Sequence, residues 1–240
     1  MKRYAVERRG CYMEFEPRLT IPENGNKYYI RKENGGYSNA IPGYPKHSSL
    51  DVLSNCVGYA QSRFNEIIGA GNCNWLKPVN AERFIDYAKP QGLKISNKPQ
   101  IGACAVWRGG DTSDGSDGAG HVAIVEAVYD DGSILTSESG YGDGRAFWTT
   151  QRVKGNSGNW GQKISSYKFL GFILNPAIVE LPAGVEWVTI RNKAADKYIN
   201  VPGIMLCDRW FIQLRSVDEP LDLARVSYDA DMGVPEVMKK

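Results

Sequence analysis

The sequence is poor in the residues that build metal centres and disulfide frameworks. It has two histidines, His47 and His121, and its five cysteines include no Cys-x-x-Cys pair. An odd number of cysteines without zinc-ribbon spacing argues against both a disulfide framework and a structural zinc site. The shortage of histidine excludes most multi-histidine metal sites, and we expect no metal and no cofactor. It also leaves few candidates for a histidine that acts as a general base.

Long apolar runs and a strong charge of one sign are also missing. No apolar stretch approaches the roughly 20 residues that cross a membrane. The net charge of +2 is too small to indicate nucleic-acid binding. Residues 1–16 are partly basic but include no apolar stretch, so we expect no signal peptide. We therefore expect a soluble monomer made in the cytoplasm, with no membrane insertion.

The apolar residues that are present follow a helical period first and a strand period afterwards. The strongest helix is expected over residues 54–69, with Ser54 or Asn55 to cap its start and Gly69 to close its end. A shorter helix is expected from Asn80 to Lys89. Strands are expected at residues 27–30, 101–107, 121–128, 133–139, 146–150 and 167–174. Helices followed by antiparallel strands indicate the α+β class.

The 240 residues suffice for one ordinary domain and a small appendage. Asn175-Pro176 indicates a boundary, because the pattern changes there. We expect an N-terminal extension at residues 1–26, a main domain at residues 27–176 and an accessory or targeting segment at residues 177–240. This last segment has strand-like stretches, and its end from Val217 to Lys240 is charged enough to suggest partial disorder.

Cys56 lies in the first turn of the expected helix at residues 54–69. The N-terminus of a helix favours the thiolate, which is the nucleophilic form of cysteine. A free cysteine is nevertheless more often a small buried core residue. The thiol alone therefore does not indicate an enzyme, and the interpretation depends on what accompanies it.

His121 opens the expected strand at residues 121–128, directly after a Gly-rich run, and is well placed to act as a base. The turn at residues 129–132 joins this strand to its partner. If that loop has four residues, Ala123 pairs with Glu138, and Glu138 lies one diagonal step from His121 on the same face, roughly 7–8 Å away. Glu126 falls on the opposite face. A slip of one residue in register would overturn this choice.

Together these three residues form a chemical unit. The histidine removes the thiol proton, the thiolate attacks an amide carbonyl, and the histidine then protonates the leaving amine. Glu138 holds one imidazole nitrogen and leaves the other for the thiol of Cys56. The backbone amide of Cys56 is expected to bind the oxyanion, and the second donor stays unidentified.

Four motifs in this order resemble the CHAP family of amidohydrolases and peptidases: Asn55-Cys-Val-Gly-Tyr-Ala, Gly120-His-Val-Ala-Ile-Val-Glu, Ser137-Glu-Ser-Gly and Phe169-Leu-Gly-Phe-Ile. The resemblance covers about residues 27–176. It implies a papain-like fold and the cleavage of amide bonds in bacterial peptidoglycan, with Cys56, His121 and Glu138 as the catalytic residues. The details look most like lysins of phages that infect Gram-positive hosts.

The resemblance has two departures. Many relatives have a polar residue just beyond the acid, where this chain has Gly140. Some relatives bind calcium through acids upstream of the cysteine, but residues 43–51 offer a single acid, and we expect no calcium site. The resemblance also implies that the protein leaves the cytoplasm through a phage-made membrane hole or on lysis, and acts at the cell wall.

Several readings stay open. We expect an N-acetylmuramoyl-L-alanine amidase, with an endopeptidase of the stem or cross-bridge peptide as the alternative. The sequence does not separate these two activities, because both use the same chemistry. An NlpC-type peptidase fits poorly, since its helix typically starts Asp-Cys-Ser-Gly. An inactive binding module of a phage particle is a third possibility. We interpret the segment with Asp111, Asp114 and Asp117 as a solvated loop and His47 as a surface residue. Trp107 and Trp148 are expected either in the core or along a substrate groove.

Overall fold

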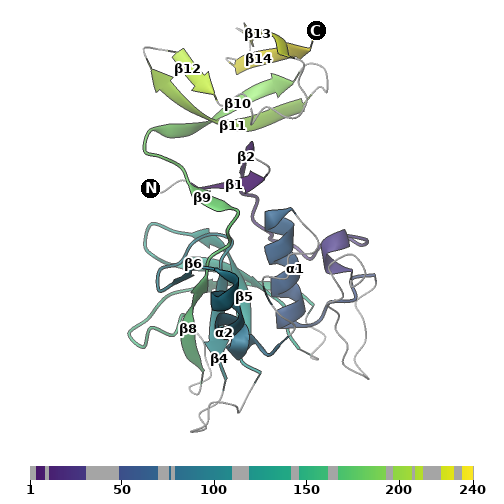
Figure 1. Cartoon of the computed structure of the whole chain (residues 1–240), viewed down its shortest axis with the longest axis vertical. Coiled ribbons are helices and arrows are strands. Elements are labelled where there is room, and N and C mark those ends of the chain that lie inside the picture. Colours follow the sequence, from purple (N-terminus) through teal and green to yellow (C-terminus); the bar gives the residue numbers. More distant parts are fainter. Residues whose placement is uncertain are drawn as a thin grey trace. The chain divides into compact units, whose positions relative to one another are not determined.

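The computed structural model of the chain divides by its internal contacts into two units, residues 17–176 and residues 1–16 together with 177–240 (Figure 1). The division expected from the sequence, with boundaries at residues 26/27 and 176/177, stays a prediction, as do the roles assigned to its three parts. The structure describes residues 4–8, 11–30, 49–69, 76, 79–109, 119–141, 146–161, 167–192, 197–206, 209–212, 223–229 and 234–239.

Residues 17–176 contain a six-stranded antiparallel sheet in the order β3-β8-β4-β5-β6-β7. Its strands are β3 (Ile95–Ser96), β4 (Cys104–Arg108), β5 (His121–Val128), β6 (Ile134–Glu138), β7 (Trp148–Arg152) and β8 (Lys168–Ile173). Helix α1 (Cys56–Ile68) packs on β5 and β6, and α2 (Phe84–Ala88) packs on β8. The α+β class and the papain-like arrangement of helices on an antiparallel sheet are confirmed.

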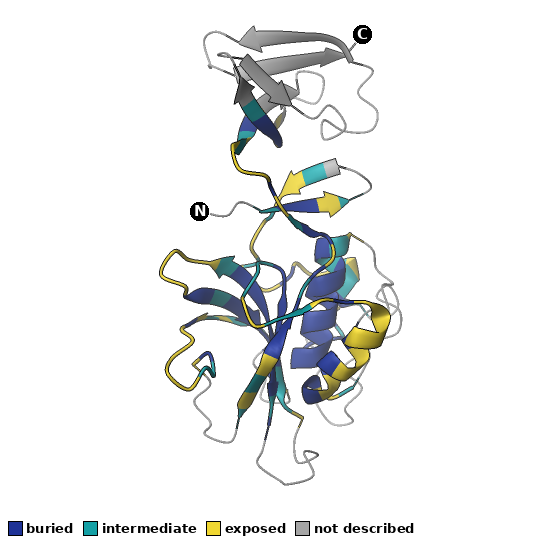
Figure 2. Cartoon of the chain, turned by 60° about the vertical axis from the view of Figure 1, so that its left-hand side comes forward, coloured by how far each residue is buried: buried dark blue, intermediate teal, exposed yellow. Residues whose placement is uncertain are grey.

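Helix α1 begins and ends where the sequence predicts. The side chain of Asn55 accepts hydrogen bonds from the amides of Val57 and Gly58, and Gly69 closes the helix at φ 80°. Almost all of α1 is buried, as the dark blue colour along its length in Figure 2 shows. A helix buried on all sides cannot rely on apolar contacts alone, because its polar residues need partners inside the protein.

The second predicted helix is real but broken into three pieces. It consists of the 3-10 turn η2 (Ala81–Arg83), then α2, and then the 3-10 turn η3 (Lys89–Gln91). Pro90 lies inside η3, where the missing N–H of proline costs little. The described helices are all too short or too polar to span a bilayer.

The strand predicted at residues 27–30 is wrong. Residues 27–29 form the 3-10 turn η1 (Lys27–Tyr29), because the side chain of Asn26 accepts the backbone N–H of Tyr28 and starts a helical turn. Tyr29 is fully buried. The aromatic residues here suggested a strand, but Tyr29 enters the core from a turn.

The hairpin of β5 and β6 reaches the predicted register at the site by a different route. Val128 pairs with Ile134, not with Ser133, so the loop is one residue longer than predicted. A β-bulge between Val125 and Ala127 then shifts the register back by one residue. Beyond the bulge Ile124 pairs with Ser137, as the predicted register requires. The two deviations cancel before the strands reach His121.

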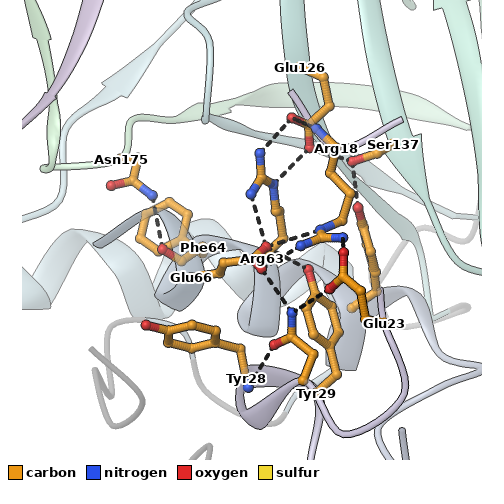
Figure 3. Close-up of polar contacts among 12 residues, drawn as sticks. Arg18, Glu23, Tyr28, Tyr29, Arg63, Phe64, Glu66, Glu126, Ser137 and Asn175 are labelled. Carbon is orange, nitrogen blue, oxygen red and sulfur yellow. Dashed lines mark hydrogen bonds and ion pairs between the residues drawn. The ribbon is translucent and has the colours of Figure 1, made fainter. Parts of the chain in front are cut away.

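The bulged residue, Glu126, is the centre of a buried ionic network beside α1 (Figure 3). Its carboxylate accepts two hydrogen bonds from Arg63 of α1, at 3.0 and 2.9 Å, and one from the backbone N–H of Arg18 at 2.9 Å. The side chain of Glu126 is 0% exposed and that of Arg63 is 7% exposed. The charge of each is therefore compensated inside the protein rather than by water.

Hydrogen bonds near this network join two other segments of the chain to α1. Glu66 accepts hydrogen bonds from Arg18, Arg63 and the hydroxyl of Tyr29, which ties residues 17–30 to α1. The buried amide of Asn175 donates to the carbonyl of Phe64 at 3.1 Å and ties the end of this unit to the same helix (Figure 3). Residues 17–26 thus contribute contacts to the main domain that their sequence pattern does not indicate.

The other unit, residues 1–16 and 177–240, contains two sheets. One has the order β2-β1-β9, from β1 (Tyr4–Arg8), β2 (Cys11–Glu14) and β9 (Ile178–Glu180). The other has the order β12-β11-β10-β14-β13, from β10 (Val185–Asn192), β11 (Lys197–Leu206), β12 (Arg209–Ile212), β13 (Leu223–Asp229) and β14 (Val234–Lys239). The strand-like stretches after residue 176 are confirmed. Strands β1 and β2 were missed, since residues 1–24 show no clear period.

The buried ionic network yields a test of stability. We expect Glu126→Gln to lower the free energy of unfolding by about 3 kcal/mol, because the buried Arg63 loses one of its two carboxylate partners and keeps only Glu66, which it shares with Arg18. The matched control is Glu23→Gln. Glu23 also faces an arginine, Arg18, at 3.8 Å, but its side chain is 74% exposed, so the loss should be about 1 kcal/mol or less. Urea unfolding followed by tryptophan fluorescence measures both, and equal losses would contradict a structural role of the network.

Candidate active site

Cys56 is the first residue of α1 and is 7% exposed. The cap that starts the helix is itself held by the sheet, because the backbone N–H of Asn55 donates to the hydroxyl of Ser139 at 3.1 Å. Ser139 is fully buried and follows β6 directly. The start of α1 and the end of β6 are thereby fixed to each other, which places the thiol of Cys56 at the end of the sheet.

His121 is the first residue of β5, and the glycine before it is required by its surroundings. Gly120 has φ +66°, and a Cβ there would lie 2.3 Å from the carbonyl oxygen of Trp107. Any side chain would have to displace that backbone. Gly120 therefore lets the chain pass close to β4 and enter β5 with the imidazole at the strand end, where Trp107 pairs with His121.

The structure brings His121 and Glu138 into direct contact. Nε2 of His121 lies 2.7 Å from Oε2 of Glu138. An ionised carboxylate only accepts hydrogen bonds, so Nε2 must carry the proton and donate it. The other ring nitrogen, Nδ1, is then available to Cys56, which lines the same cavity and whose interaction with the ring raises the pKa of His121. Cys56, His121 and Glu138 thus form one connected chain of polar contacts.

The electrostatics of this chain favour charged forms of both the acid and the base. Burial alone would raise the pKa of Glu138, but the hydrogen bond from His121 and the positive charge of Arg152 outweigh burial and lower it to about 2. Burial alone would lower the pKa of His121, but its hydrogen bonds with Cys56 and Glu138 raise it to about 9. Near neutral pH the site therefore favours a carboxylate next to an imidazolium.

Arg152, at the end of β7, is a member of the site that the sequence analysis missed. Its Nη2 lies 2.7 Å from Oε1 and 2.9 Å from Oε2 of Glu138. The predicted strand at residues 146–150 ended two residues too early to include it. The signal was the alternation along residues 148–152, which places residues 148, 150 and 152 on one face of the strand. In β6 and β7 Glu138 pairs with Trp148 and Thr136 with Thr150, so Arg152 lies further along the same face.

Two indole rings flank the imidazole of His121. The ring centroid of Trp107 lies 5.9 Å from that of His121 with an interplanar angle of 29°, and that of Trp148 lies 6.4 Å away at 10°. Trp107 is fully buried in a core cluster, so it supports the ring from within rather than lining a groove. Trp148 is half-buried. Both restrict the plane in which the imidazole can turn.

A cavity of about 420 Å³ opens beside Cys56 and His121. Tyr141 and Tyr167 line it, and so does Asn80, whose side chain does not cap the helical turn that it precedes. The remaining lining residues are Asn55, Val57, Val79, Ala119 and Gly120. The thiol and its histidine are therefore next to a space in which an amide substrate can lie, with polar groups on its walls.

Four residues singled out in the sequence lie outside the described residues, namely His47, Asp111, Asp114 and Asp117, and so do two of the cysteines, Cys73 and Cys207. Cys104 is described, and complete burial raises the pKa of its thiol, as expected for a structural cysteine. Across the described part of the chain, no group of three or more histidine, cysteine, aspartate or glutamate side chains is arranged to hold a metal ion.

Comparisons with known proteins find one domain family and several similar proteins. Residues 45–140 match the CHAP domain family. Staphylococcal secretory antigen SsaA from Staphylococcus aureus strain NCTC 8325 / PS 47 is 30% identical over 128 residues, which cover 53% of this chain and 43% of that protein. Staphylococcal secretory antigen ssaA2 from strain MRSA252 is 31% identical over 111 residues, which cover 46% and 36%.

A solved structure of an N-acetylmuramoyl-L-alanine amidase from Staphylococcus aureus is 24% identical over 47% of this chain and 31% of that chain, with a TM-score of 0.33. This chain spans less than half the length of the curated relatives named above. The family match includes Cys56, His121 and Glu138 and ends before Arg152.

The hydrogen bonds of His121 yield a test by titration. With two histidines in the chain, NMR follows both imidazoles, and a His47→Asn variant assigns the two signals. We expect the pKa of His121 to be about 9. It should fall in Cys56→Ala, because the contact with Cys56 favours the protonated ring, and fall again when Glu138→Gln is added. A pKa of His121 that is the same with and without Cys56 would show that the two side chains do not interact.

Proposed function

From the CHAP domain that this chain contains at residues 45–140, we propose that the protein is a peptidoglycan hydrolase. It cleaves amide bonds of the bacterial cell wall with Cys56 as nucleophile, and we assign it to the N-acetylmuramoyl-L-alanine amidase type. The observation that carries the proposal is the connected chain from Cys56 through His121 to Glu138 beside an open cavity. Action at the cell wall and an origin as a phage lysin belong to the same proposal.

The geometry accounts for each chemical step. Transfer of the thiol proton to Nδ1 of His121 gives the imidazolium, which is the form that the site favours near neutral pH, and the thiolate of Cys56 then attacks the carbonyl carbon of the amide. The tetrahedral intermediate collapses as the imidazolium protonates the leaving amine, which gives a thioester and a free amine. Water, deprotonated by His121, then hydrolyses the thioester and restores the thiol. Glu138 keeps the proton on Nε2 throughout, so that Nδ1 is always the nitrogen that exchanges protons.

The developing oxyanion needs hydrogen-bond donors near the thiol. The side chain of Asn55 already binds the amides of Val57 and Gly58, which leaves the amide of Cys56 as the donor at the helix start. A second donor is available on the wall of the cavity, from the side-chain amide of Asn80 or the hydroxyl of Tyr167. These two groups are the candidates for the second oxyanion donor, which the sequence alone did not identify.

The products of peptidoglycan digestion test the proposal. Purified Gram-positive peptidoglycan is digested with the wild-type protein and with Cys56→Ala, and the fragments are analysed by mass spectrometry. We expect free lactyl carboxylates on muramic acid with intact stem peptides, which only an amidase produces. New amino termini within the stem or bridge would instead show an endopeptidase with the same chemistry. No products from a folded wild-type protein would contradict the proposed hydrolase.

The role of Glu138 has its own test. We expect Glu138→Gln to lower kcat/KM by roughly 10²–10⁴-fold, because an amide neither fixes the Nε2–H tautomer of His121 nor stabilises the imidazolium. The matched control is Glu126→Gln, which removes another buried carboxylate of the same hairpin from Arg63 and not from His121. Rates are compared below the unfolding temperature of both variants. Equal losses in the two variants would argue that only folding is affected.

A further inference from the structure

We propose that Arg152 is a positioning residue of the active site, which holds the carboxylate of Glu138 ionised and in one orientation so that Glu138 fixes His121 for the reaction with Cys56. The inference rests on the proposed function and assigns a role in it to a residue outside the family match at residues 45–140. It adds a fourth member to the chain of polar contacts, on a strand that carries none of the other three.

The contacts of Glu138 leave its carboxylate no freedom to turn. Oε1 accepts hydrogen bonds from Nη2 and Nε of Arg152, at 2.7 and 3.2 Å, and from the hydroxyl of Thr136 at 2.7 Å. Oε2 accepts from Nη2 of Arg152 at 2.9 Å and from His121 at 2.7 Å. A carboxylate has about four lone-pair sites. Those of Glu138 are therefore all engaged, and one of them is aimed at the imidazole.

Arg152 is itself held by three other residues. Its Nη1 donates to the carbonyl of Trp160 at 3.1 Å, and its Nε lies 3.0 Å from the hydroxyl of Thr136. The guanidinium carbon lies 4.9 Å from the ring centroid of Trp107, within the range of a cation–π contact. The side chain is 6% exposed. A guanidinium fixed in this way positions its carboxylate partner, which a flexible surface arginine does not.

The charges around Glu138 explain why its carboxylate needs Arg152 as well as His121. In the described part of the chain, the charged groups that touch its carboxylate are Arg152 on β7 and His121 on β5. During catalysis His121 alternates between the imidazolium and the neutral ring. Each time the ring is neutral, a carboxylate that is 1% exposed would lack a counter-charge, and burial would favour its protonation. Arg152 keeps its charge throughout and prevents this.

A test on Cys56 itself separates this role from the choice of substrate. The rate of alkylation of Cys56 by iodoacetamide is followed against pH in the full chain, by mass spectrometry of the peptide that contains Cys56. We expect the acid limb of the profile to move upwards by about one pH unit in Arg152→Gln, with a rate at pH 6 about tenfold below the wild type. Arg152→Lys keeps the charge and should restore part of the rate.

Two comparisons make the result specific. Arg63→Gln removes an equally buried arginine from a similar ion pair with Glu126, and it should shift the pH profile of alkylation less than Arg152→Gln does, because Arg63 does not touch Glu138. In the Glu138→Gln background, Arg152→Gln should change the profile no further, because Arg152 acts through Glu138. The double variant also carries no unpaired buried charge, so it remains informative if Arg152→Gln does not fold.

A profile of Arg152→Gln equal to that of the wild type would overturn the proposal. So would a further loss when Arg152→Gln is added to Glu138→Gln, or an equal shift in Arg63→Gln. Alkylation needs no peptidoglycan, so a wild-type protein that leaves cell walls intact would contradict the proposed function and still permit the test of Arg152. Where hydrolysis is measurable, we expect Arg152→Gln to lower kcat about tenfold or more with little change in KM.

Discussion

The ion pair between Arg63 and Glu126 fixes helix α1 on strand β5, and the candidate site depends on that attachment. Cys56 begins α1 and His121 begins β5, so their contact exists only while these two elements keep one register. Apolar packing alone would allow a helix to slide on a sheet. The buried ion pair, with its hydrogen bonds at 3.0 and 2.9 Å, prevents such sliding, because a shift of the helix would separate the charges of Arg63 and Glu126 in the interior.

Strand β6 adds two further attachments through the residues on either side of Glu138. The hydroxyl of Tyr59 in α1 donates to Ser137 at 2.7 Å, and Ser139 binds the backbone of Asn55. Successive residues of a strand point to opposite faces. The sequence Ser137-Glu-Ser therefore serves α1 with its two serines and His121 with its glutamate. This arrangement explains physically why the three residues form one motif.

The sequence was informative where the interactions are local or follow a period. The cap at Asn55, the end at Gly69 and the alternation in β5 depend on neighbours within a few residues, so their patterns are visible in the chain. The register between β5 and β6 was right beyond the bulge although the loop length was wrong. The bulge at Glu126 restores the register because that carboxylate must face Arg63, a requirement that no pattern within the hairpin expresses.

Contacts between distant segments were not predictable in this way. Arg152 reaches Glu138 from the neighbouring strand β7, and nothing near residue 152 shows that the partner is a buried carboxylate. Arg18 joins the network of Glu126 from a segment without periodicity, which the sequence analysis left outside the main domain. The strand expected at residues 27–30 was wrong for a related reason, because the aromatic residues there are buried through a turn held by Asn26.

Glu126 and Glu138 show how one kind of ion pair serves two purposes. Both are buried carboxylates of the same hairpin, and each is bound by a buried arginine, Glu126 through two hydrogen bonds and Glu138 through three, at 2.7–3.2 Å. The difference lies in the remaining partners. Those of Glu126 are a serine hydroxyl and a backbone amide, which do not change charge near neutral pH, so its pair is structural. Those of Glu138 are a threonine hydroxyl and an imidazole, and the charge of the imidazole changes in the proposed catalytic cycle. A permanent cation beside it is what allows a buried carboxylate to stay ionised through that change.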